Sequence, residues 1–189
     1  MEVQHVNFRL FLRDGDNIDF DPIVPVFHGW IQDGVLNEVL VDVADYRHVP
    51  SGPGVVLIGH EANYSLDHTD GRWGLRYYRK ARSMGTNSDR IKQALRRVVD
   101  VSLRLEAEPS LEGALDFDSG EIEFVIADRL LAPNDEATFD AVRPDLEDAL
   151  SALIPGNEFA LTHRKGPKRL FSVAIRFAHP LNRKGMLAR

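Results

Sequence analysis

The sequence predicts an α+β protein in which helices cover one face of a largely antiparallel sheet. Alternating apolar and polar residues mark several strands, and segments with apolar residues at helical spacing lie between them. Asp70-Gly71 separates two strand-like runs, and this dipeptide is the strongest short-range signal for a hairpin. Because strands joined by short turns run antiparallel, these features together favour an antiparallel sheet packed against helices.

The first part of the chain is expected to form a strand, a helix and a second strand. Residues 3–13 alternate and predict a strand with one face in the core. Residues 22–33 follow as a helix, which begins with an Asp-Pro pair and ends before a glycine. Residues 38–46 alternate again and predict the second strand. The residues that share one face of that strand are Val39, Val41 and Val43.

The central hairpin is expected over Val55–Arg82, with a type I′ turn at Asp70-Gly71. This turn sets the register of the two arms, and a slip of one residue would move every side chain to the other face. The period of two along the first arm places His60 on the apolar face with Tyr64. The pairs expected across the arms are Tyr64–Tyr77, Leu66–Leu75, Ser65–Arg76 and Glu61–Lys80.

The second half is expected to repeat the order of strand, helix and hairpin after a long helix at 88–106. A small hairpin is predicted at 115–124 with its turn at Ser119-Gly120, and a helix at 133–153 contains Pro144. The last hairpin turns at 166–168, with Leu161 opposite Val173, Phe159 opposite Ile175 and Glu158 opposite Arg176. Two ferredoxin-like β-α-β-β halves joined by the long helix would fit this order. Residues 1–178 are expected to form a single domain, and residues 179–189 a frayed basic tail.

Charge alternates along the chain in four segments. Residues 1–71 carry 3 basic and 12 acidic side chains, and residues 72–104 carry 10 and 2. Residues 105–158 carry 2 and 15, and residues 159–189 carry 8 and none. These segments either pair with one another on the folded surface or form basic patches for an anionic partner. A symmetric contact between two copies would also match opposite segments, so a homo-oligomer is expected.

Composition and missing motifs exclude several classes of chemistry. The chain has no cysteine, which removes disulfides, thiol nucleophiles and cysteine-ligated metal sites. It shows no P-loop, dinucleotide fingerprint, H-E-x-x-H or G-x-S-x-G pattern, so no cofactor and no metal are expected. No apolar run approaches the roughly 20 residues of a membrane span. A soluble cytoplasmic protein without a membrane partner is therefore the expectation.

One cluster of polar residues could bind a small molecule. Asp45, Tyr46 and His48 stand where the second strand ends, a usual position for binding groups. His60 and Tyr64, predicted on the core-facing side of the hairpin, are expected nearby. A histidine on that side is either a hydrogen-bonded core residue or part of an acid–base pocket. These five residues are the candidate ligand-binding set, and none is assigned a catalytic role.

The favoured function is a binding or interaction module that associates with itself. The main alternative is a small-molecule enzyme with a His/Asp/Tyr pocket near His60. A weaker alternative is nucleic-acid binding through the cations of the central hairpin and of the loop at 164–169, with stacking on Tyr78. Acidic residues on the same hairpin face and a net charge of −6 disfavour nucleic acid as a partner.

Overall fold

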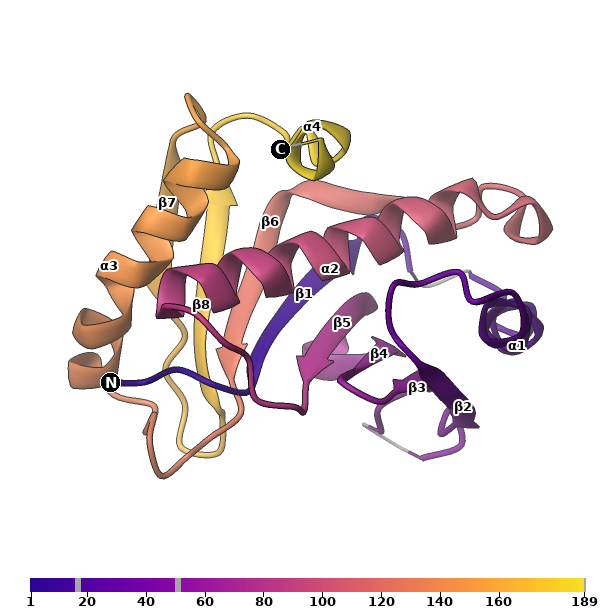
Figure 1. The fold of residues 1–189 in the computed structure, drawn as a ribbon, viewed down its shortest axis with the longest axis horizontal. Coiled ribbons are helices and arrows are strands. Elements are labelled where there is room, and N and C mark those ends of the chain that lie inside the picture. Colours follow the sequence, from indigo (N-terminus) through magenta and orange to yellow (C-terminus); the bar gives the residue numbers. More distant parts are fainter. Residues whose placement is uncertain (16–17, 50–51, 189) are drawn as a thin grey trace.

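A computed structural model describes residues 1–15, 18–49 and 52–188. Within these residues the strands form one antiparallel sheet of eight in the order β2-β3-β4-β5-β1-β6-β8-β7, and the helices lie on one side of it (Figure 1). This confirms the predicted α+β class. The strands are β1 (Val6–Leu12), β2 (Leu40–Asp45), β3 (Val55–Gly59), β4 (Ala62–Asp67), β5 (Gly74–Arg79), β6 (Phe117–Ile126), β7 (Phe159–His163) and β8 (Phe171–Phe177). The α-helices are α1 (Ile23–Asp33), α2 (Asn87–Ala107), α3 (Glu136–Leu153) and α4 (Arg183–Leu187), and short 3-10 turns stand at Thr69–Gly71 and Pro109–Leu111.

The two halves of the chain follow the same path across the sheet. Their first strands, β1 and β6, lie side by side in the middle and run antiparallel. A helix then leads to an outer edge, α1 to β2 and α3 to β7, and the following strands return toward the centre. The first half returns through β3, β4 and β5, whereas the second returns through β8 alone. The ferredoxin-like comparison therefore stays a prediction.

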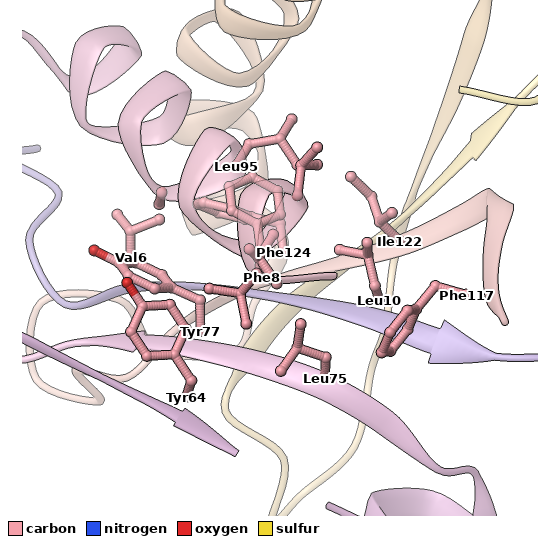
Figure 2. Close-up of a cluster of buried hydrophobic side chains, with 14 of the residues drawn as sticks. Val6, Phe8, Leu10, Tyr64, Leu75, Tyr77, Leu95, Phe117, Ile122 and Phe124 are labelled. Atoms are coloured by element: carbon pink, nitrogen blue, oxygen red, sulfur yellow. The ribbon is translucent and has the colours of Figure 1, made fainter. Parts of the chain in front are cut away.

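The core fills the space between the sheet and the helices, with α2 over the central strands. Alternation along the central strands aims one set of side chains at this helix, where they are fully buried (Figure 2). Phe8 and Phe124 pack with ring centroids 5.4 Å apart, and Tyr64 and Tyr77 pack at the same separation. Thr86 caps the start of α2 by accepting a hydrogen bond from the Asp89 amide. Burial of this apolar surface between the sheet and the helices is the main favourable contribution to folding.

The register of the central hairpin is confirmed. Tyr64 pairs with Tyr77 and Leu66 with Leu75, as the Asp-Gly turn predicts. Asp70 and Gly71 both adopt positive φ, at 56° and 71°. Ladder pairing ends at Asp67 and Gly74, so the turn sits at the centre of a wider loop, residues 68–73.

The prediction that His60 faces the core is wrong. The first arm is two strands, β3 and β4, that turn back on each other at His60-Glu61, and His60 is exposed. The turn breaks the period of two that the prediction assumed. A side chain at Gly59 would approach the Ala62 carbonyl oxygen to 2.7 Å, so the tight return depends on this glycine.

Two predicted hairpins differ from the structure. Residues 115–124 do not form one, because β6 is a continuous strand through Gly120, and Phe117 pairs with Leu12 of β1. The last hairpin exists, but Leu161 pairs with Ile175 and Phe159 with Phe177 rather than with Val173 and Ile175. Because β7 ends at His163 and β8 begins at Phe171, the loop between them, residues 164–170, is longer than predicted. This shift of two residues in the pairing preserves the faces of both strands.

The β2 edge of the sheet and the C-terminal segment also differ from the predictions. Pairing of β2 with β3 is irregular between Leu40 and Asp42, and it leaves Val39 and Val41 exposed by 69% and 59%. The predicted frayed tail is wrong for residues 183–187, which form α4 with Met186 buried. Arg183 ties this helix to α2 through Glu106, at 2.8 Å. No helix in the described ranges has the length and apolar character needed to cross a bilayer.

Replacing Phe124 by alanine should lower the free energy of unfolding by about 3–5 kcal/mol, because the cavity left under α2 cannot refill. Chemical denaturation of both proteins measures the difference. Met84→Ala is the matched control, since Met84 is 91% exposed and its truncation should change stability by less than about 0.5 kcal/mol. A Phe124 variant as stable as the control would contradict the proposed core.

Candidate functional site

The face of the sheet opposite the helices, called the open face here, carries a row of charged side chains. Alternation along β1 sends Arg9 to this face, while Phe8 and Leu10 point to the core. Arg9 pairs with Arg76 of β5 on one side and with Glu123 of β6 on the other. The middle of the open face is therefore ionic rather than apolar.

Several of these charged side chains are buried although the described helices all lie on the other side of the sheet. Arg9 is 1% exposed, and its guanidinium lies 2.9 Å from the carboxylate of Asp67, which is itself buried. Arg76 approaches the same carboxylate to 2.8 Å. Burial lowers the pKa of Arg9, while the Asp67 charge opposes that shift. The three side chains form a compact charged group with one more positive than negative charge.

Two hairpin loops supply the cover. The β4–β5 loop, residues 68–73, and the β7–β8 loop, residues 164–170, start at opposite ends of the sheet and meet over the open face. Arg169 of the second loop forms an ion pair with Asp70 of the first. The same guanidinium donates to Glu123 at 3.1 Å, which attaches both loops to the sheet below.

A second acidic residue gathers cations farther along the open face. Glu121 lies 2.7 Å from Arg164, 3.1 Å from Arg176 and 3.3 Å from Arg72. Burial opposes ionisation of Glu121, but the hydrogen bond from Arg176 and the charges of the other two arginines outweigh it. The pKa of Glu121 is lowered as a result, so this carboxylate is ionised at neutral pH.

The two loops and the sheet enclose an open cavity of about 570 Å³. Ser172 of β8 lies in its lining, is 1% exposed, and its Oγ has no hydrogen-bond partner among the described residues. A buried hydroxyl without a partner is costly, so this atom is suited to meet a ligand or a water molecule. The lining residues are Thr69, Asp70, Arg76, Glu123, Val125, Lys165, Gly166, Pro167, Lys168, Arg169, Leu170 and Ser172.

The β7–β8 loop is fixed at its base by the segment that joins β6 to α3. Asn134 donates to the carbonyl oxygens of Arg164 and Gly166, at 3.2 and 3.3 Å. Arg129 donates to the Lys168 carbonyl at 2.7 Å. His163, buried between aromatic rings, holds Asn134 through a 2.7 Å hydrogen bond. The wall of the cavity is therefore held in place without a ligand.

The five residues that the sequence singled out do not form one pocket. Asp45 pairs with Val55 at one end of β2 and β3, whereas His60 follows the other end of β3. Asp45 instead forms an ion pair with Arg47 at 2.7 Å, and hydrogen bonds from Arg47 lower its pKa to about 2. Tyr46 and His48 are exposed beside it. Whether these residues bind a ligand stays a prediction.

The Tyr64 side chain is buried in the core, and its hydroxyl is hydrogen-bonded. Its hydroxyl donates to Glu38 on the helix side of the sheet. Burial, together with this hydrogen bond, raises the pKa of Tyr64, so its phenol stays protonated at neutral pH. His60 contributes its backbone amide to Val39 at 2.8 Å while its side chain is exposed. Acid–base chemistry that needs these two side chains in contact is not supported by this arrangement.

The open-face residues were missed as a group because each looks like an ordinary solvent-facing charge in the sequence. One signal was present in β1, where Phe11 shares the face of Asn7 and Arg9 and so hinted that this face is partly covered. In the structure the Arg72 guanidinium lies 3.7 Å from the centroid of the Phe11 ring. The cluster of four cations at 164–169 is visible in the sequence, but its position over the sheet depends on contacts with residues distant in the sequence.

No group of three or more histidine, aspartate or glutamate side chains suited to hold a metal ion occurs in residues 1–15, 18–49 and 52–188. Comparison with known protein families found no family that matches the chain, and no curated protein matches it either. The open face and its cavity therefore have to be interpreted from their own chemistry.

Replacing Asp67 by asparagine should lower the free energy of unfolding by about 3 kcal/mol or more, because Arg9 and Arg76 then share a buried site without a counter-charge. Urea denaturation measures the change. The control is Asp42→Asn, an exposed aspartate on the same face, which should change stability by less than about 0.5 kcal/mol. Equal stability of the two variants would show that the Asp67 carboxylate is not needed.

Proposed function

We propose that this protein is a binding module that holds a small molecule in the cavity of the open face. The observation that carries the proposal is the buried Ser172 hydroxyl, which lies in the cavity lining without a partner among the described residues. The volume of about 570 Å³ lies within the range usual for small-molecule sites, and charged and apolar side chains both contribute to the lining. Binding fits these features better than the acid–base pocket predicted around His60.

The proposal is tested with a fluorescent aromatic sulfonate, 1-anilinonaphthalene-8-sulfonate, added to the full chain. The dye should gain fluorescence with the native protein, because it enters a partly apolar cavity. Ser172→Phe and Gly166→Trp should both remove most of this gain by filling the cavity from its floor and from its wall. Gly166 has ordinary backbone geometry and little around it, so its substitution puts the fold at small risk.

Ser110→Phe is the control, because Ser110 is exposed in the turn after α2 and lies outside the cavity. Circular dichroism confirms that each variant is folded. If both cavity variants bind the dye as the native protein does, the cavity is not the binding site and the proposal fails.

Self-association is a second candidate function, and the exposed edge of β2 supports it. Val39 and Val41 present apolar surface there, and an edge strand offers unpaired backbone groups to a second copy. The alternating charge segments give less support. Many of their side chains pair within the chain, among them Arg79 with Glu61 and Arg90 with Glu2, as the alternative of internal pairing predicts.

Val41→Lys should shift a dimer to monomer, because a charge on an edge strand blocks strand addition. Sedimentation velocity at low and high salt measures the state. An apolar, hydrogen-bonded contact should survive high salt, whereas a contact made by charge segments should weaken. Leu130→Lys is the control, because Leu130 is 95% exposed in the segment that joins β6 to α3 and lies outside the β2 edge. A native protein that is monomeric in both salts would reject self-association.

A further inference from the structure

Resting on the proposed binding function, we propose that the cavity of the open face accepts a phosphate monoester, a small molecule that joins a phosphate group to an apolar body. Three features of the open face favour such a ligand: its charge balance, the hydrogen-bond donors in the cavity lining and the apolar part of that lining. Each of these is a property of residues on β5, β6, β8 and the two loops.

The first support is an excess of positive charge in a protein that is acidic overall. The cavity lining holds four cations, Arg76, Lys165, Lys168 and Arg169, against the two carboxylates Asp70 and Glu123, a net charge of +2. The ion pairs that continue from the lining across the open face keep this excess. They join seven cations to five anions, and Lys168 of the lining adds an eighth cation. The cations in ion pairs are Arg9, Arg72, Arg76, Arg164, Lys165, Arg169 and Arg176, and the anions are Asp67, Asp70, Glu121, Glu123 and Glu136.

A dianion would bring this balance close to neutral, whereas a cationic ligand would increase the excess. The excess persists although the whole chain carries a net charge of −6. Clefts with walls of one sign concentrate ligands of the opposite sign. The sign of the ligand therefore follows from the open face and not from the composition of the chain.

The second support is the set of donors that the ligand would meet. Lys168 is exposed at the mouth and forms no ion pair with another described residue, so its ammonium is free to bind. Lys165 pairs at 2.9 Å with Glu136, but both side chains are largely exposed and such pairs are weak. Ser172 adds a hydroxyl at the floor. Donors from the wall and from the floor suit a group with several charged oxygens, which a phosphate monoester presents.

The third support is the remaining lining. Val125 on the floor and Pro167 and Leu170 in the wall give the cavity an apolar side. Its volume exceeds what a phosphate group alone would fill, so an apolar body has room beside the anion. Asn134 and Arg129 hold the loop that carries Pro167 and Leu170, so little ordering is needed when a ligand enters.

The test uses three compounds with a similar aromatic body and different charge: phenyl phosphate, benzyl alcohol and benzylamine. Each is titrated into the uniformly ¹⁵N-labelled full chain at pH 8, where the phosphate is a dianion. We expect phenyl phosphate to shift the amide signals of residues 168–172 and to bind more tightly than the neutral and cationic compounds. Added sodium chloride should weaken this binding.

Lys168→Ala should weaken phenyl phosphate binding about tenfold, because one charge-assisted contact is lost. Lys184→Ala, an exposed lysine of α4 outside the cavity, should leave the affinity unchanged. Benzylamine binding as tightly as phenyl phosphate, or a Lys168 variant with native affinity, would overturn the phosphate assignment and leave the binding module standing. Absence of any shift in the cavity with all three compounds, together with failure of the dye test, would overturn both.

Discussion

The buried ion pair between Arg9 and Asp67 is the constraint on which the open face depends. It joins the central strand β1 to β4, and neither side chain reaches solvent to any useful extent. Two charges can stay buried only when they are paired and further bonded, so this part of the face has to be organised around them. Arg76 and the two covering loops complete that organisation, and the cavity is the space that they leave.

Helices on one side of the sheet explain why the other side could become a site. The helix side is filled by α1, α2 and α3 and forms a continuous apolar core. Among the described residues, two hairpin loops close the open face and meet through Arg169 and Asp70. Loops placed on a rigid sheet are a usual location for binding groups, because the sheet fixes their ends while their sequence stays free to vary. The proposed ligand site therefore lies on the open face, opposite the apolar core.

Short-range signals in the sequence were enough to predict the fold class and the register of the central hairpin. Asp70-Gly71 predicted that Tyr64 faces Tyr77, because this dipeptide favours positive φ at both positions. The turn at His60 carries no such dipeptide, so the sequence pattern continues through it as one strand and predicts the wrong face for His60. Gly59 is required there by a close approach to Ala62, which only the folded chain reveals. The charged side chains of the open face were beyond prediction for a related reason, because their burial comes from loops distant in the sequence.

The open face, and not the Asp45 or His60 region, is the proposed location of the ligand. A crystal structure of the full chain soaked with phenyl phosphate tests this directly. We expect density for the compound beneath the β7–β8 loop, with phosphate oxygens within hydrogen-bond distance of Lys168 and Ser172. Density beside His60 or Asp45 with an unoccupied cavity on the open face would contradict the account.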